Sequence, residues 1–164
     1  MIQITTLGAV SGLVIAIGLI LRRVPPAYGM MIGTGTLAGI IAHSGLSHFL
    51  VEWLKASGLP AYLLAPISGI AMSAATASTT AGTAVASNVF GPIILSLGVP
   101  ALGAAAMMHA GATVLDHMPH GSFFHATGGS VGMNIRERLS AIPYETLIGL
   151  SMTVASTVIY GIIQ

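Results

Sequence analysis

Charged side chains are too scarce in this sequence to cover a surface that faces water. Only 5% of its 164 residues are charged and 54% are hydrophobic, whereas a soluble domain carries about 25% charged residues. We therefore expect an all-α integral membrane protein that crosses the cell membrane several times. The sequence has no basic stripe, so nucleic acid is not an expected partner, and the absence of cysteine excludes disulfides and thiolate metal sites.

The order of apolar and polar segments predicts one membrane domain over residues 1–164. Residues 30–57 divide into two arms that are each too short to span a bilayer. They predict a re-entrant hairpin with Ser44 and Gly45 at its tip, and one long tilted helix broken at Gly45 is the alternative. The other predicted segments are a transmembrane helix with its turn over 4–29, an interrupted helix over 60–97, transmembrane helices over 101–115 and 143–162, and a polar loop over 116–142.

The stretch 71–92 is too polar for a plain membrane helix. Backbone that is rich in hydroxyls and broken by glycine is tolerated at membrane depth only where it lines a cavity or is buried in protein. Transporters build substrate sites from such interrupted helices. The break is predicted over roughly 73–82, and the alternative is that these hydroxyls bond back to carbonyls of their own helix. The polar and glycine positions are Ser73, Thr76, Ser78, Thr79, Thr80, Gly82, Thr83, Ser87 and Asn88.

The second half of an interrupted helix begins with unpaired N–H groups and a partial positive charge. Such a helix start favours an anionic group. The sequence therefore predicts that a substrate carboxylate is held near Thr79-Thr80-Ala81-Gly82.

Residues 116–125 form the second unusual stretch, with four ionisable side chains next to apolar sequence. An ionisable residue within a membrane segment is a functional hypothesis by default, and histidine changes charge near physiological pH. We expect Asp116, His117 or His120 to carry a coupling proton. The same residues, together with His125, also suit a divalent metal, so a membrane metal-binding protein is an alternative.

Several of these motifs resemble, in order, the C-terminal half of the gluconate permease family. In that family an ASGLGD turn and a GLPPLLLA-like helix start precede GSATVAxTTAAGxxAP and then SHVNDSGFW. This chain has a Ser-Gly-Leu turn at Ser44, a Gly-Leu-Pro at Gly58, the hydroxyl-rich run from Ala74 to Gly82, and Asp-His-Met-Pro-His-Gly-Ser-Phe from Asp116. The resemblance covers roughly residues 30–164.

The resemblance implies a carrier of the ion-transporter superfamily, built from inverted repeats that each hold a re-entrant hairpin and an interrupted helix. Such carriers move gluconate-like sugar acids or other small carboxylates such as citrate, driven by protons or sodium. His117 matches the family's histidine. The expected substrate-binding residues are Ser44, Gly45, Ser78, Thr79, Thr80, Gly82 and Asn88, and the expected coupling residues are Asp116, His117 and His120.

The chain departs from the family in sequence and in length. The family's Asn-Asp pair is Pro119-His120 here, and Asp116 stands where the family has serine. Family members are much longer, so the chain is expected to be one half: a fragment, a truncated reading frame or a subunit of a split transporter. Its site would need a missing N-terminal repeat or a second copy. No enzyme activity and no cofactor are expected, and a structural half-subunit without a site is the remaining alternative.

Overall fold

The computed structural model describes residues 58–163 continuously and isolated residues before them, at positions 10, 11, 14, 15, 17, 18, 22, 36, 39, 40, 44, 45, 48, 49, 52, 53 and 56. All regular structure in the described residues is helical, as the composition predicts. The predicted helix over 4–29 and most of the hairpin over 30–57 lie outside the described residues. The turn at its expected tip is described, with Gly45 at a φ of 74°.

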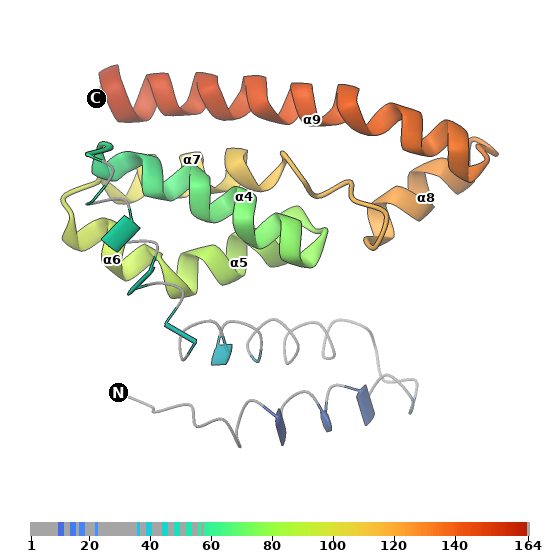
Figure 1. Cartoon of the computed structure of the whole chain (residues 1–164), viewed down its shortest axis with the longest axis horizontal. Helices are drawn as coiled ribbons and strands as arrows, with labels where there is room; N and C mark the ends of the chain where they lie inside the picture. The colour runs from blue at the N-terminus through green and yellow to red at the C-terminus, as the bar shows by residue number, and fades with distance from the viewer. Residues whose placement is uncertain are drawn as a thin grey trace.

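Helices α4 (Leu64–Thr76) and α5 (Thr79–Val89) form a helical hairpin. A one-turn 3-10 helix, Ala61–Leu63, leads into α4. The sequence predicts an interrupted helix over 60–97 with its arms end to end, but the chain reverses at Ala77 and the arms lie side by side (Figure 1). Gly82 of α5 permits this packing, because a Cβ there would lie 2.8 Å from the Ser73 backbone of α4.

The short helix α6 (Gly91–Ser96) follows α5 at the Gly91-Pro92 pair, and a turn at Gly98 leads into α7 (Ala101–Ala112). Helix α7 packs closely on α4, since a Cβ on Gly69 or Gly111 would collide with the backbone of the facing helix. The apolar core lies among α4, α5, α6 and α7. Its largest fully buried side chains include Leu64, Val85, Phe90, Ile94, Met107 and Met108.

Helix α7 ends at Ala112 and the chain runs without regular helix to α8 (Ser122–Ser130). We call residues 113–121 the break. The sequence predicts a polar loop over 116–142 that leads to a short polar helix or connector at Asn134, whereas the structure has α8 and the start of a long helix within that range. The interrupted element of this chain is therefore α7–break–α8, and the hydroxyl-rich stretch is the tip of the neighbouring hairpin.

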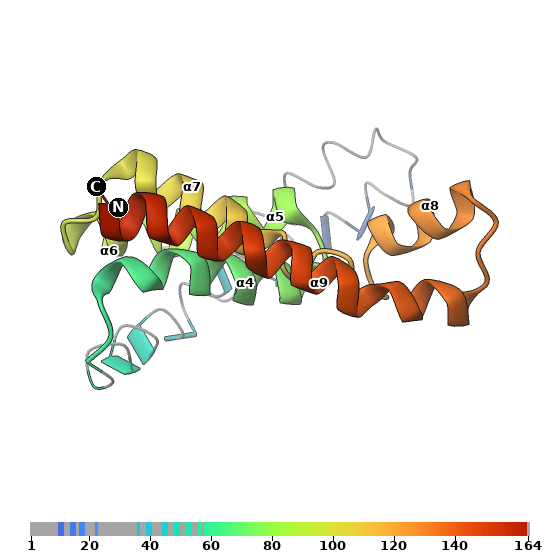
Figure 2. The ribbon, with the colours of Figure 1, turned by 90° about the horizontal axis from the view of Figure 1, so that it is seen from above.

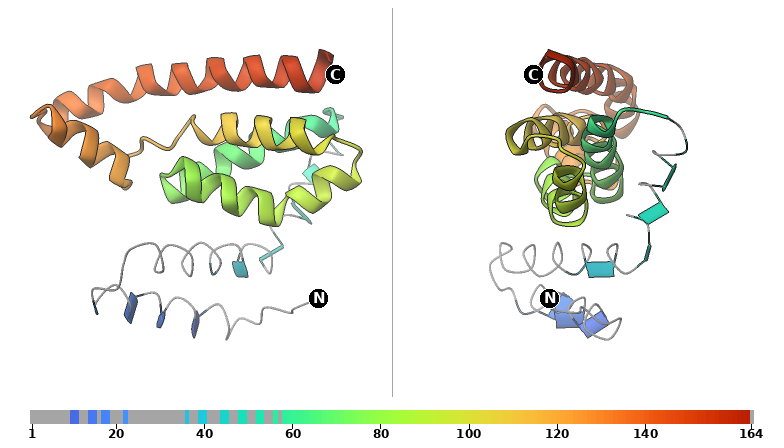
Figure 3. Two further views of the ribbon diagram at one scale, coloured as in Figure 1. Left: turned by 180° about the vertical axis from the view of Figure 1, so that it is seen from behind. Right: turned by 90° about the vertical axis from the view of Figure 1, so that its left-hand side faces the viewer.

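The C-terminal helix α9 (Ile135–Thr157) continues as a π-helix, Val158–Ile163. The sequence predicts its start at Pro143, but the helix begins earlier, where Asn134 and Glu137 form a capping box. In the described residues, this is the one helix whose length and composition would allow it to cross a membrane. It lies along α7 and reaches past the break to α8 (Figures 2 and 3).

Candidate functional site

The tip of the α4–α5 hairpin is built by the residues between the two helices. Ala77 adopts the left-handed conformation (φ 44°, ψ 44°), and its N–H donates to the Ser73 carbonyl. Ser78 then caps α5, since its hydroxyl accepts from the Ala81 N–H at 3.2 Å. The helix interruption that the sequence predicts over roughly 73–82 is therefore confined to Ala77 and Ser78.

The hairpin tip meets the break through a hydrogen bond between Thr79 and Asp116. The Thr79 hydroxyl donates to the Asp116 carboxylate, which places a negative charge beside the first turn of α5. A helix start carries a partial positive charge, so it stabilises a carboxylate at this position. The structure thus joins two expected site residues that lie 37 positions apart in the sequence.

His117 continues this contact from the break to α9. Its Nδ1 lies 3.3 Å from Asp116 Oδ1, and its Nε2 lies 2.9 Å from the Thr146 hydroxyl. The His117 side chain is 1% exposed, whereas the Asp116 side chain is 19% exposed. A buried imidazole that bonds at both nitrogens has a fixed orientation, so His117 keeps Nδ1 toward Asp116 and Nε2 toward Thr146.

Close backbone packing holds the tip and the break together. A Cβ on Gly121 would collide with Ala77, so only glycine lets the two segments approach this far. His120 adds a link from the break to α4, with its Nε2 3.1 Å from the Ala74 carbonyl. His120 thus serves as a connection between elements in this structure.

A small cavity of about 150 Å³ opens between the break, α8 and α9. Asp116, His117 and Glu145 contribute its ionisable groups. Glu145 is paired with Arg138 at 2.7 Å. The other lining residues are Thr113, Phe123, Ile148, Gly149 and Met152. A larger hollow of about 400 Å³ lies between α6 and α7, but its lining is almost entirely apolar and it is remote from these groups.

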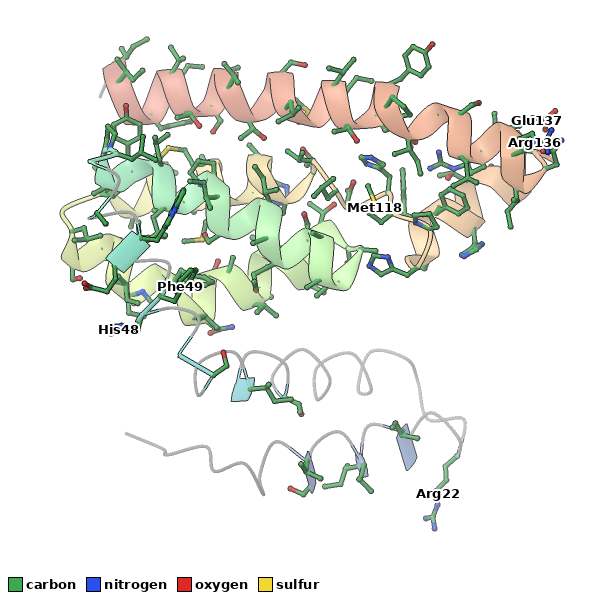
Figure 4. All side chains as sticks on the ribbon, viewed as in Figure 1. Arg22, His48, Phe49, Met118, Arg136 and Glu137 are labelled. Atoms are coloured by element: carbon green, nitrogen blue, oxygen red, sulfur yellow. The ribbon has the colours of Figure 1, made fainter. Side chains whose placement is uncertain are left out.

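The remaining predicted site residues lie outside this cluster. Thr80 is exposed, Gly82 packs within the hairpin, and the Asn88 amide donates to the Ala84 carbonyl of its own helix at 2.8 Å. Ser44 and Gly45 form an exposed turn. The residues that follow this turn, His48 and Phe49, lie apart from Met118 of the break, toward the left of Figure 4.

Several hydroxyls of the polar stretch bond to carbonyls of their own helix, as the alternative prediction states. Ser73 donates to the Ile70 carbonyl at 3.0 Å and Thr76 to the Met72 carbonyl at 2.9 Å. Thr83 instead lies 3.3 Å from Nδ1 of His109 on α7. Among the hydroxyls of the polar stretch, Thr79 is the one that bonds a carboxylate.

The histidines do not gather around a common point. The Nε2 of His125 lies 2.8 Å from the Pro119 carbonyl, and the Nε2 of His120 lies 3.1 Å from the Ala74 carbonyl. In the described part of the chain, no group of three or more His, Cys, Asp or Glu side chains is placed to hold a metal ion.

Three residues of this region were missed by sequence reasoning: Arg138, Glu145 and Thr146. Arg138 is 3% exposed and bonds the Phe124 carbonyl, the Thr127 hydroxyl and Glu145. The missed signal is the Asn-x-x-Glu capping box at Asn134. It places the helix start early enough to bring Arg138 to the α8–α9 interface.

The described fold and site define a helical protein of membrane-like composition, in which two backbone breaks meet around a carboxylate and a histidine. No family model and no solved structure matches the chain. A protein of Haemophilus influenzae described as an uncharacterized transporter is 65% identical to it over 144 residues. That match covers 88% of this chain and 34% of the relative, so the chain spans about a third of the relative's length. The chain is thus similar to a transporter, and the relative's description does not name the gluconate permease family.

Proposed function

We propose that this chain forms part of a secondary transporter in the cell membrane that moves small organic carboxylates, such as gluconate-like sugar acids or citrate, together with protons. The observation that carries the proposal is the contact between Thr79 at the hairpin tip and Asp116 in the break. A hairpin tip that meets an interrupted helix at ionisable groups fits a transport site, since transporters build such sites from non-helical backbone. The likeness to a transporter over most of the chain supports the same class.

In this proposal the first turn of α5 holds the substrate carboxylate. The first N–H groups of a helix have no intrahelical partner, and here Ser78 occupies that of Ala81. The backbone N–H groups of Thr79 and Thr80 would then bind the substrate.

Asp116 would couple this binding to a proton. An ionised Asp116 beside the first turn of α5 repels a second carboxylate, because like charges a few ångströms apart destabilise each other strongly in a low-dielectric site. When Asp116 or His117 takes up a proton, that repulsion falls and the substrate anion binds. Substrate and proton would therefore be bound and released together.

The rest of the transport site would come from polypeptide that is absent from this chain. Inverted-repeat carriers assemble their midplane site from two related halves. We propose that an N-terminal repeat, or a second copy of the chain, packs against the hairpin and the break, and that 30–57 is the re-entrant hairpin of this half.

The test is uptake of labelled gluconate, citrate and related acids into vesicles that contain the complete protein. We expect uptake that rises when the outside is made acidic and that collapses when a protonophore removes the gradient. Uptake driven by sodium alone would overturn proton coupling, and the absence of uptake for every small carboxylate would overturn the substrate class. Divalent metal in stoichiometric amounts in the purified protein would favour the metal-binding alternative.

A further inference from the structure

We propose that Thr146 of α9 is a positioning residue for the coupling proton. It holds His117 through Nε2 so that Nδ1 faces Asp116. This inference rests on the proposed function, because it concerns how the proton is held at that same site. Thr146 would act through His117 and would not touch the substrate.

The geometry is a line of three hydrogen bonds across three elements. Thr79 of α5 donates to Asp116, Asp116 lies 3.3 Å from His117 Nδ1, and His117 Nε2 lies 2.9 Å from the Thr146 hydroxyl. His117 is 1% exposed. Water therefore cannot replace Thr146 at Nε2 without a change in packing.

Proton uptake reverses the direction of the last bond in this line. When Asp116 is ionised and His117 is neutral, Nδ1–H donates to the carboxylate, and the Nε2 lone pair accepts from the Thr146 hydroxyl. One added proton leaves Nε2–H as a donor, whether that proton sits on the imidazole or on Asp116 with the imidazole in its other tautomer. Thr146 must then accept. A hydroxyl can both donate and accept, so threonine or serine suits both states and valine suits neither.

The charged groups around His117 are few in the described residues. Asp116 of the break faces it directly, and Glu145 of α9 lines the same cavity. Glu145 is paired with Arg138, so its charge is largely balanced. The α5 neighbour in this line, Thr79, carries no charge. Asp116 is therefore the unbalanced charge that faces His117, and Nε2 meets the uncharged Thr146 hydroxyl.

Helix α9 offers a matched control in Thr153. Its hydroxyl is also buried and donates to carbonyls, Ala110 on α7 at 2.9 Å and Gly149 on its own helix at 2.8 Å. Replacing Thr153 with valine thus removes a buried threonine hydroxyl from the same helix while leaving His117 untouched.

The experiment measures carboxylate uptake against external pH for the wild-type protein and for Thr146→Val, Thr146→Ser and Thr153→Val, at matched amounts in the membrane. We expect Thr146→Val to reduce uptake about tenfold or more, because Nε2 is left buried and unpaired. Its pH midpoint should move to lower pH, since an unpaired N–H on a charged imidazole is less favourable than an unpaired lone pair. Thr146→Ser and Thr153→Val should keep the wild-type midpoint.

Thr146→Ala is measured in the same way if valine prevents folding. A midpoint that is unchanged in Thr146→Val or Thr146→Ala, or one that moves as far in Thr146→Ser, would overturn the inference. These results are distinct from failure of the proposed function, in which the wild-type protein itself takes up no carboxylate.

Discussion

The contact with Asp116 distinguishes Thr79 from the other hydroxyl residues of the polar stretch. Many hydroxyls of the polar stretch bond to their own helix, and such bonds neither bind a ligand nor join elements. Thr79 differs because it begins α5 and points away from the hairpin to a carboxylate on another element. The same bond explains why Asp116 can be held near an apolar core.

At the residue scale, Thr79→Val should be far more harmful than Thr80→Val. A hydrogen bond to a charged group contributes about 1.5–3 kcal/mol, so loss of the Thr79 hydroxyl should lower uptake by more than tenfold. Thr80→Val would affect only an exposed side chain of the same type and should have a smaller effect. Thr79→Ser should restore activity. If Thr79→Val transported normally, the assignment of this contact to the site would be wrong.

At the scale of elements, the approach of the hairpin tip to the break depends on Gly121. Ala77 occupies the place that a Cβ at position 121 would need, and both segments are backbone that cannot shift independently. The left-handed Ala77 is itself a conformation that costs about 1–2 kcal/mol for a residue other than glycine. The tip is therefore held in place by its contact with the break.

Gly121→Ala should separate the tip from the break, whereas Gly129→Ala should be tolerated. A Cβ on Gly129 of α8 meets nothing within 4 Å. Overpacking at a tight site costs about 1–3 kcal/mol, so we expect lower thermal stability in detergent and loss of uptake for Gly121→Ala alone. Equal melting temperatures for the two variants would contradict this account of the contact.

Helices α8 and α9 are joined by the buried Arg138. Its guanidinium bonds Glu145 at 2.7 Å and lies 4.9 Å from the centre of the Phe124 ring. Its Nη2 finds no hydrogen-bond partner in the described part of the chain. The bonds from Nε to the Phe124 carbonyl and the Thr127 hydroxyl are the ones that join α9 to α8.

Arg138→Gln should destabilise the protein by about 3 kcal/mol, because it leaves Glu145 unpaired beside the cavity. Arg136→Gln is the control, since Arg136 is exposed on the same helix, and surface substitutions usually stay within about 0.5 kcal/mol. Unfolding in detergent measures both. An Arg138→Gln variant as stable as Arg136→Gln would show that the Arg138 contacts contribute little.

At the scale of the whole molecule, α9 presents an apolar face that the described chain does not cover. Leu147 is 63% exposed and Val154 is 60% exposed, and few residues along the helix from Ile135 to Ile163 are buried. Apolar side chains in such a row would be unstable in water, so lipid or further polypeptide should cover them.

The absence of cysteine makes this testable with single thiols. Leu147→Cys and Val154→Cys should resist a membrane-impermeant thiol reagent in intact vesicles. Arg136→Cys, at the polar start of the helix, should react. After detergent is added, Leu147→Cys and Val154→Cys should react with the reagent only if lipid had covered these positions. Equal reaction at all three positions before detergent would mean that α9 does not lie in a bilayer.

The sequence by itself determined the all-helical class, the membrane-like composition and the two polar stretches that hold Thr79 and Asp116. These follow from composition and short-range pattern, which act on each segment alone. The start of α9 was predicted wrongly, because Pro143 indicates a helix start, whereas the capping box at Asn134 begins the helix earlier.

Only the tertiary structure decided which polar residues meet. The hydroxyl-rich run encodes a backbone break but not the angle between its arms. That angle is set by close packing, of Gly82 on Ser73 and of Gly121 on Ala77. Thr146 carries no sequence signal, and it reaches His117 only because α9 folds back along α7. Contacts between distant segments depend on the whole packed core, so local sequence could place the breaks without showing that they face each other.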